Sequence, residues 1–240
     1  MKSINKFSWI LVPLIAFGGI FYPLLGLLVL LIMFVLMVVG LINGRYWCGN
    51  LCPHGSLFDN IINKISFSKT IPPILKSSYF KWGFFIFFMG MFVLRFIRVL
   101  DHLGSEKFFA NLGFLFVLQY LIMPTIVGIS LASFISPRAW CSFCPMGTLA
   151  EIMYRLGKIT GLNILDQKVN ITAPDKCQEC GACADACPLE LKPYKNFNHN
   201  NEFDNNNCIK CGKCVQSCPL NILNLNRKAQ RKSQTISENI

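Results

Sequence analysis

Charged residues are scarce in this chain of 240 residues. Asp, Glu, Lys and Arg make up 15% of it, whereas 53% of the residues are hydrophobic and the mean hydropathy is +0.45. This composition is too apolar for a soluble fold and indicates a membrane protein. Acidic residues are the scarcest charged type, with 12 against 23 basic residues, so the formal net charge is +11. Such a surplus suits an anionic lipid surface or an acidic redox partner better than nucleic acid.

Histidine is also rare, and its rarity excludes a further class of protein. None of His54, His102 and His199 falls inside a long apolar segment, so two histidines cannot hold a haem within a membrane. Glycine-rich nucleotide motifs and Ser/His/Asp arrangements are not apparent. What the chain does have is 12 cysteines, grouped near prolines in a pattern typical of metal ligation in a reducing compartment rather than of disulfides.

Long uncharged segments predict four membrane spans. Residues 7–42 contain no charge and are too many for one span of about 20 residues, so we expect a turn near Pro23 and two helices, the first unusually short. A third span is expected at 79–99, and a fourth at 112–135 with a kink at Pro124. Nothing after residue 137 is long and apolar enough to cross.

Basic residues predict how these spans are oriented. With the N-terminus in the cytoplasm, ten basic residues of the membrane part face inward and three face outward. The inward ones are Lys2, Lys6, Arg45, Lys64, Lys69, Lys76, Lys81, Arg138, Arg155 and Lys158, and the outward ones are Arg95, Arg98 and Lys107. We therefore expect a multi-pass protein of the cytoplasmic (inner) membrane, with both termini inside and residues 101–111 outside.

An internal repeat supports this layout. Residues 45–59, the first Cys-Pro motif, parallel residues 138–151, the second Cys-Pro motif; both read R-x-W-C and continue to Cys-Pro-x-Gly, with one residue fewer between the cysteines of the second. Each copy follows an apolar span. The repeat predicts two parallel helical hairpins related by an axis along the bilayer normal.

A second repeat, offset by 31 residues, carries the strongest signal. The pattern C-x2-C-x2-C-x3-C-P occurs twice, and in such pairs the fourth cysteine of each copy ligates the other copy's [4Fe-4S] cluster. Two zinc sites would leave the third cysteine and the x3-C-P arm of each copy unexplained. The predicted ligands are Cys177, Cys180, Cys183 and Cys218 for cluster 1, and Cys208, Cys211, Cys214 and Cys187 for cluster 2.

These patterns predict a membrane all-α domain of four helices in two hairpins at 1–165, and a small α+β two-cluster ferredoxin domain at 166–226. Residues 227–240 have no apolar periodicity and are predicted to be a disordered tail.

The other four cysteines form a candidate additional redox or metal site, because the two Cys-Pro motifs are predicted on one membrane face near the repeat axis. An iron-sulfur cluster, a copper ion, a redox-active dithiol pair and a structural zinc ion all fit four thiols, and an unoccupied site also remains open. We expect the second cysteine of each motif to be the more deeply held, because Pro53 and Pro145 fix the turn after it. The four residues are Cys48, Cys52, Cys141 and Cys144.

On these motifs the C-terminal part resembles bacterial-type two-cluster ferredoxins over about 55 residues. Nearly the whole chain resembles the membrane-bound polyferredoxin family, which includes the quinol dehydrogenase component of periplasmic nitrate reductase, the membrane regulator of nitrous oxide reductase and a cytochrome oxidase assembly protein. The resemblance implies several spans, cytoplasmic cysteine-proline motifs and a quinone as small-molecule partner. The sequence departs from the family in the shorter second motif, Cys141 to Cys144.

The function expected from this organisation is an electron relay. Single electrons would pass between a soluble cytoplasmic carrier, or oxidoreductase subunits, and a membrane partner such as quinone or quinol. Whether the chain is itself an enzyme or an electron-transfer component of an oxidoreductase stays open. Two alternatives also stay open: a membrane copper-ion reductase or assembly factor, and a redox-sensing regulatory or scaffold protein.

Overall fold

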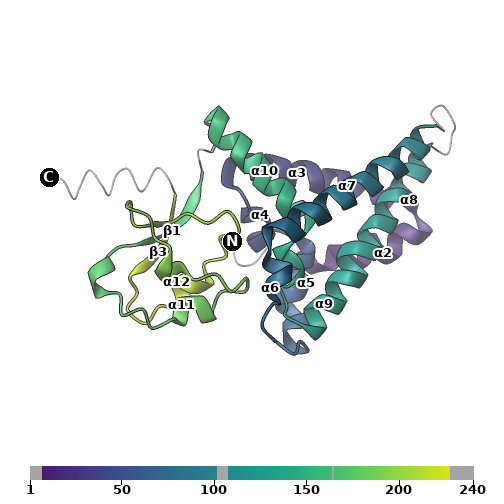
Figure 1. Ribbon diagram of the computed structural model, residues 1–240. Helices are drawn as coiled ribbons and strands as arrows, with labels where there is room; N and C mark the ends of the chain where they lie inside the picture. Colours follow the sequence, from purple (N-terminus) through teal and green to yellow (C-terminus); the bar gives the residue numbers. More distant parts are fainter. Residues whose placement is uncertain (1–6, 102–107, 164, 228–240) are drawn as a thin grey trace. The chain divides into compact units, whose positions relative to one another are not determined.

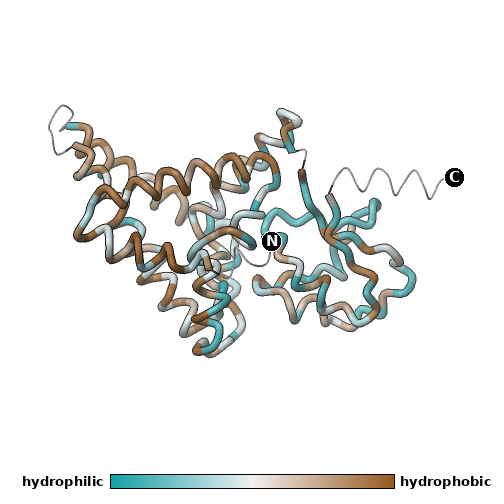
Figure 2. Tube along the Cα trace, turned by 180° about the vertical axis from the view of Figure 1, so that it is seen from behind, coloured by the Kyte–Doolittle hydropathy of each residue, from teal (hydrophilic) through white to brown (hydrophobic). Residues whose placement is uncertain are grey.

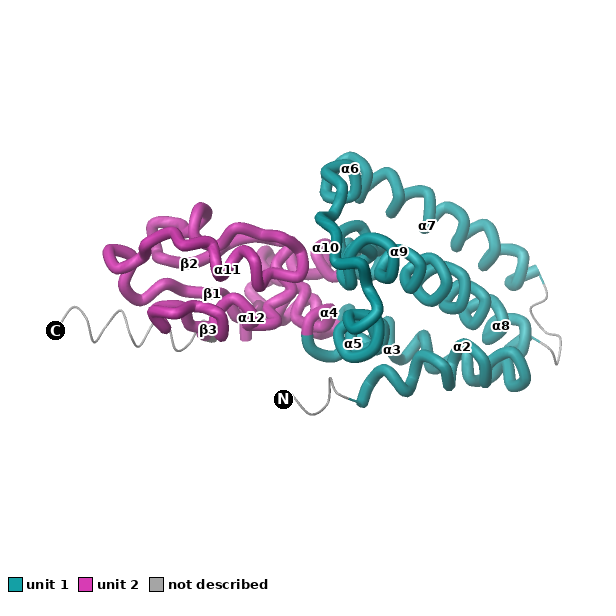
Figure 3. Tube along the Cα trace, turned by 90° about the horizontal axis from the view of Figure 1, so that it is seen from below, with its two compact units in different colours: residues 1–37, 50–149 teal, residues 38–49, 150–240 magenta. Residues whose placement is uncertain are grey.

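The computed structural model describes residues 7–101, 108–163 and 165–227, which fall into two compact units (Figures 1 and 3). Unit 1 comprises residues within 1–37 and 50–149, and unit 2 comprises residues within 38–49 and 150–240. This division does not coincide with the expected boundary at residue 165, because the last residues of one apolar helix and a later helix pack with the cysteine-rich part. Of the expected tail, Arg227 lies in a strand, and 228–240 lie outside the described residues.

Unit 1 is helical. Two helices, α3 and α10, and the short α4 are shared between the units. The elements in chain order are η1 (Ser8–Ile10), α2 (Leu11–Phe21), η2 (Pro23–Gly26), α3 (Leu27–Asn43), α4 (Tyr46–Asn50), α5 (Pro53–Asn60), η3 (Ile62–Lys64), α6 (Pro73–Lys76), α7 (Ser78–Leu100), α8 (Phe108–Tyr120), η4 (Leu121–Val127), α9 (Gly128–Phe134), η5 (Trp140–Ser142) and α10 (Pro145–Thr160).

Three helical segments are long and apolar enough to cross a membrane: Pro23–Asn43, Ser78–Leu100 and Phe108–Phe134. Figure 2 shows that the helical part of the chain is largely brown, the colour of hydrophobic residues. A fourth apolar helix, Ser8–Phe21, is shorter. The expected division of the first apolar run is confirmed, since α2 ends at Phe21 and the next helical segment begins at Pro23. The expected first span thus corresponds to a helix shorter than the other three.

At Pro124, where we expected a kink, the helix contains a π-helical segment, η4. Proline has no N–H to donate and its ring crowds the preceding turn, so the helix widens there. The hydroxyl of Thr125 donates to the carbonyl oxygen of Tyr120 at 2.8 Å, which satisfies one backbone group freed by the widening.

Small residues let the apolar helices of unit 1 approach closely. The segments α2 and η2 pack against α8. A Cβ atom placed on Gly26 would overlap the carbonyl oxygen of Gly113, and one on Gly113 would overlap that of Pro23. Such backbone-to-backbone contact is the usual way in which apolar helices associate where the hydrophobic effect cannot drive them together.

Unit 2 contains the only sheet among the described residues. Its strands are β1 (Gln167–Ile171), β2 (Glu202–Phe203) and β3 (Leu223–Arg227), ordered β2-β1-β3 and antiparallel. The connecting segments include η6 (Pro174–Lys176), α11 (Ala182–Asp185), η7 (Pro193–Lys195) and α12 (Lys213–Gln216). Its core is formed by buried side chains of the three strands, of α11 and of the residue before β3: Val169, Ile171, Cys183, Phe203, Ile222 and Leu223. Unit 2 thus contains the small sheet and short helices expected of the α+β part of the chain.

Candidate metal centres

Four cysteines of unit 2 line one hollow between α11 and the loop that follows α12. It encloses about 400 Å³ not filled by protein atoms, part of it open to solvent. Three of the cysteines come from the first ferredoxin motif and the fourth from the second, and Tyr194, Phe197 and Ile222 add apolar walls. The cysteines are Cys177, Cys180, Cys183 and Cys218.

A second hollow of about 360 Å³ repeats this arrangement with the motifs exchanged. Leu189, Leu191 and Ile209 supply apolar walls. Its cysteines are Cys187, Cys208, Cys211 and Cys214. The structure thus brings the eight cysteines into the two groups that the motif spacing predicts. Ligation of a cluster by each group stays a prediction.

The chemistry of these thiols fits a cationic core between them. Burial raises the pKa of Cys214 to about 12, and the charges of neighbouring cysteines raise it further in the same direction. Burial likewise raises the pKa of Cys208 to about 11, although a hydrogen bond from the backbone of Lys210 lowers it in part. Four thiolates crowded together repel one another unless positive charge compensates them, and ferric and ferrous iron supply that charge in an iron-sulfur cluster. The donor set therefore fits two [4Fe-4S] clusters.

The backbone of the two ferredoxin motifs is the same at equivalent positions. Glu179 and Lys210, 31 residues apart, both have a positive φ (49° and 55°), as do Glu190 and Asn221 (52° each). Left-handed conformations are uncommon outside glycine, so their pairwise recurrence shows that the two loops curl alike. The first loop comprises residues 177–180, and the second loop comprises residues 208–211.

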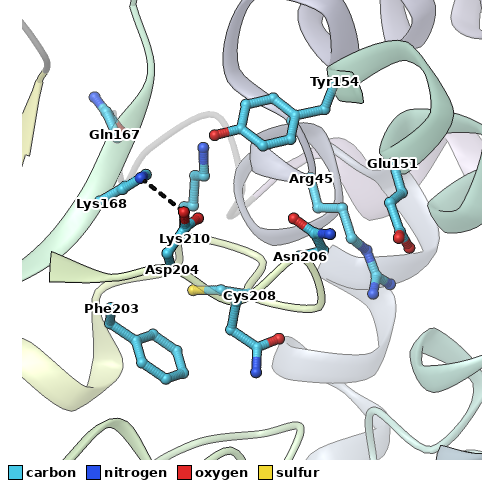
Figure 4. A pocket seen from close by; sticks show the side chains of 12 residues that line it. Arg45, Glu151, Tyr154, Gln167, Lys168, Phe203, Asp204, Asn206, Cys208 and Lys210 are labelled. Carbon is cyan, nitrogen blue, oxygen red and sulfur yellow. Dashed lines mark ion pairs between the residues drawn. The ribbon is translucent and has the colours of Figure 1, made fainter. Parts of the chain in front are cut away.

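The surroundings of the second loop differ from those of the first. Lys210 is buried, and its ammonium group donates to Oδ1 of Asp166 at 2.6 Å and to Oδ1 of Asn43 at 2.9 Å. It also lies 4.9 Å from the ring centre of Tyr154, whose hydroxyl donates to the other oxygen of Asp166 at 2.8 Å. Figure 4 shows Lys210 and Tyr154 in a third pocket, separate from the two cysteine hollows, which Cys208 also lines. Motif analysis gave no sign of this network.

The four cysteines of the Cys-Pro motifs are divided between the units: Cys48 belongs to unit 2, and the other three belong to unit 1. Cys48 and Cys141 are buried, whereas Cys52 and Cys144 are partly exposed. The expectation that the second cysteine of each motif is the more deeply held is wrong. Cys52 and Cys144 immediately precede the helices that begin at Pro53 and Pro145, and a residue just before a helix start is less enclosed than one within a packed turn.

Across residues 7–101, 108–163 and 165–227, no three or more Cys, His, Asp or Glu side chains are close enough to hold a single metal ion. A cubane cluster separates its thiolates more widely than one ion does, so this finding concerns mononuclear sites. Binding at the four Cys-Pro cysteines stays a prediction.

The second Cys-Pro motif is joined to the first by a buried ion pair within unit 1. Arg138, 1% exposed, donates from Nε and Nη2 to the two carboxylate oxygens of Asp59 at 3.2 and 2.7 Å. Its Nη1 lies 3.6 Å from Sγ of Cys141. Burial disfavours the charged guanidinium, but the charges of Cys141 and Asp59 prevail and raise the pKa of Arg138. Arg138 therefore places a permanent positive charge beside a buried thiol.

A buried polar group two residues after Cys52 was also missed by sequence reasoning. Nε2 of His54 lies 2.9 Å from the Thr125 hydroxyl, and its ring lies 4.5 Å from that of Tyr120, edge to face. Burial lowers the pKa of His54 to about 3, so the imidazole is neutral. Because the Thr125 hydroxyl donates to Tyr120, we assign the ring proton to Nε2. The Tyr120 hydroxyl is buried and has no hydrogen-bond partner among the described residues.

Two family models match the chain. One, described as a 4Fe-4S binding domain, matches twice, at residues 25–72 and 117–163, which include the two Cys-Pro motifs. The other, described as a 4Fe-4S dicluster domain, matches residues 176–223 and so includes both ferredoxin motifs.

Two uncharacterized proteins of Methanocaldococcus jannaschii are similar to the chain. MJ0749 is 26% identical over 162 residues, and MJ0750 is 27% identical over 167 residues. Each alignment covers 66% of this chain, and they cover 57% and 64% of the respective relatives, so the chain spans less than two thirds of either. No solved structure matches. The two kinds of 4Fe-4S domain show that this chain is a ferredoxin-like iron-sulfur protein with a role in electron transfer.

Proposed function

We propose that the chain is a membrane-anchored relay that passes single electrons between a soluble carrier and a quinone or quinol. One observation carries the proposal. Unit 2 is a single compact body that contains both four-cysteine hollows and also the last residues of α3, which belongs to the apolar segment Pro23–Asn43. A redox module fixed to the end of a span is suited to serving a membrane reaction.

The eight hollow-lining cysteines are proposed to hold two [4Fe-4S] clusters in the crossed arrangement. Such clusters supply one-electron chemistry at reduction potentials that depend on charge, hydrogen bonds and solvent access. Residues of the chain would adjust these potentials. Apolar side chains such as Leu189 and Ile222 keep water away, and backbone N–H groups donate to the thiols of Cys183 and Cys187.

The membrane arrangement is proposed to be four spans in two hairpins, with the ferredoxin part in the cytoplasm, as in the membrane-bound polyferredoxins. The double match of one family model supports a duplicated hairpin, because its two copies cover about the same length and end after the two Cys-Pro motifs. In this arrangement, Ser8–Phe21 is the remaining span. Among the alternatives for the Cys-Pro cysteines, the description of that family model favours an iron-sulfur cluster.

The pair of His54 and Tyr120 supports quinone as the membrane partner. Reduction of a quinone to a quinol consumes two electrons and two protons, so a site for it needs donors to the quinone oxygens. The unpartnered Tyr120 hydroxyl is such a donor, and π-helical turns like the one that follows it are frequent at functional sites. The neutral His54 imidazole, held by Thr125, lies beside it.

Anaerobic purification with iron and sulfide analysis and EPR spectroscopy, before and after addition of a quinone, tests the relay. We expect signals of reduced [4Fe-4S] clusters after chemical reduction and their loss when a short-chain quinone is added. Clusters that reduce added copper ions but not the quinone would favour the metal-ion reductase instead. Clusters that exchange electrons with neither would favour a sensor or scaffold.

A further inference from the structure

We propose that the two ferredoxin loops have separate tasks. The second loop, 208–211, fastens the ferredoxin part to residues 43–49, beside Cys48. The first loop, 177–180, is the docking site for a soluble one-electron carrier with a basic surface. The docking role of the first loop rests on the proposed function, whereas the anchoring role of the second loop does not.

The two loops have one backbone form but opposite environments. Between its cysteines the first loop has Gln178 and Glu179, both exposed, whereas at the equivalent positions the second loop has Ile209 and Lys210, both buried. The left-handed conformation that Glu179 shares with Lys210 shows that the difference is not one of local folding. It arises from what covers each loop.

Ile209 is covered by the first Cys-Pro motif. A Cβ atom placed on Gly49 would overlap the carbonyl oxygen of Ile209, so the α4 backbone lies directly against the loop at the residue that follows Cys48. Only glycine permits an approach this close. Nη1 of Arg45, from the same motif, lies 3.5 Å from the carbonyl oxygen of Asn207, the residue before the loop.

Lys210 makes a further attachment of the second loop. Its bonds to Asp166 and Asn43 link the loop to the start of the sheet and to the end of α3, and Asn43 also accepts from the backbone N–H of Gln167 at 2.9 Å. Moving Lys210 away from Asp166 would leave a buried charge without compensation, so the ion pair holds the loop in one position. The second loop is therefore attached through two adjacent residues to one short segment.

The first loop lies in a stretch with an excess of exposed acids. Three acids, Asp175, Glu179 and Asp185, stand against two bases, Lys176 and the Lys195 that lies over the ring of Tyr194. This local excess is opposite in sign to the net charge of the chain. Cys180 is itself exposed, so a carrier can approach the first hollow closely. An acidic rim steers basic partners and rejects acidic ones.

Electrons then have a defined order of sites. The soluble carrier loses one electron at the hollow of Cys180, and the electron leaves unit 2 from the hollow of Cys208 beside the Cys48 segment. Two such transfers, with two protons, reduce one quinone. In the reverse direction one quinol releases two electrons and two protons, and two carriers each gain one of the electrons.

Hydrogen-deuterium exchange on the cluster-loaded, full-length protein in lipid nanodiscs tests the attachment without any turnover. Peptides that include the second loop should exchange more slowly than peptides that include the first, although their backbones are alike. The matched variants Lys210→Glu and Glu179→Lys exchange the charges at equivalent positions. Lys210→Glu should speed exchange in the second loop and at 43–49 by at least about tenfold with iron content retained, and Glu179→Lys should not.

Equal protection of the two loops in the unaltered protein would overturn the attachment, and this comparison holds even if Lys210→Glu fails to fold. Docking is tested with cytochrome c as a basic one-electron acceptor and flavodoxin as an acidic one. Glu179→Lys should slow reduction of cytochrome c several-fold at low salt, and the loss should fade at high salt. An unchanged rate would refute the docking site. Failure to reduce a quinone would refute the proposed function while leaving the exchange contrast intact.

Discussion

Lys210 and Asp166 form an ion pair of 2.6 Å in which both side chains are buried, at 8% and 3% exposure. Burial lowers the pKa of Lys210, and Asp166 opposes that effect. The pair links the second ferredoxin motif to the residue just before β1, so its removal should loosen unit 2 as a body.

We expect Lys210→Met to destabilise unit 2 by about 3 kcal/mol, because Asp166 would keep a buried charge without its main partner. Denaturant unfolding followed by loss of iron-sulfur absorbance measures this. The control Lys192→Met removes an exposed lysine of the same unit and should change stability by less than about 0.5 kcal/mol. Equal effects of the two variants would contradict a structural role for the pair.

Replacing Cys218 by Ser should perturb the cluster whose other predicted ligands are Cys177, Cys180 and Cys183. The reason is that Cys218 lines their hollow although it belongs to the second motif. EPR spectra of the reduced protein measure it, with Cys187→Ser as the matched variant for the other hollow. Damage by Cys218→Ser that is confined to the cluster of Cys208, Cys211 and Cys214 would rule out crossed ligation.

Asp59→Ala should destabilise unit 1 by about 3 to 5 kcal/mol, because the fully buried Arg138 would lose a carboxylate held at 2.7 Å. Thermal unfolding in detergent measures the change. Removing both charges with Asp59→Leu and Arg138→Met should recover part of the loss. If the double variant is as unstable as the sum of the single ones, the two residues are not coupled.

His54 should make the stability of unit 1 depend on pH. Since burial lowers its pKa to about 3, the folded chain binds one proton fewer than the unfolded chain between that value and about 6.5. The contribution of the neutral His54 to the free energy of unfolding is therefore fully present above pH 6.5. Below that pH it falls by about 1.4 kcal/mol for each pH unit. Unfolding measured from pH 7 to pH 5 should show this slope, and His54→Gln should remove it. A slope that persists in His54→Gln would assign it to another group.

The proposed orientation predicts which positions an impermeant thiol reagent reaches in intact cells. A cysteine placed at Asp101, exposed at the end of α7, should react, and one placed at the exposed Asn63 should not. The expected outer segment 101–111 includes residues 102–107, which lie outside the described part of the chain. Labelling at Asn63 with none at Asp101 would invert the topology.

Sequence patterns were sufficient where the information is local. The spacing of cysteines predicted how Cys187 and Cys218 group with distant partners, because a motif of fixed length limits the reach of each thiol. Hydropathy located the long helices, and Pro124 marked the irregular turn. Contacts between distant residues could not be read in this way. Lys210 and Asn43 are 167 positions apart, and a lysine between two cysteines is normally expected in solvent.

The burial order of the Cys-Pro cysteines was mispredicted for a related reason. Proline after Cys52 and Cys144 does fix the backbone, as expected, but a rigid turn can still leave its side chains exposed to solvent. Burial depends on what packs over a residue. Gly49, next to Cys48, shows this most clearly, because the Ile209 backbone lies against it.

The short helix Ser8–Phe21 has a consequence for the lipid around the protein. Its 14 residues rise about 21 Å, whereas a bilayer's hydrocarbon core is about 30 Å thick. Close packing of α2 and η2 against α8 leaves little freedom for the helix to move away from its neighbours. Where it crosses as the first of the four proposed spans, the bilayer must thin beside it, and the protein should favour membranes with shorter acyl chains over thicker, more ordered ones.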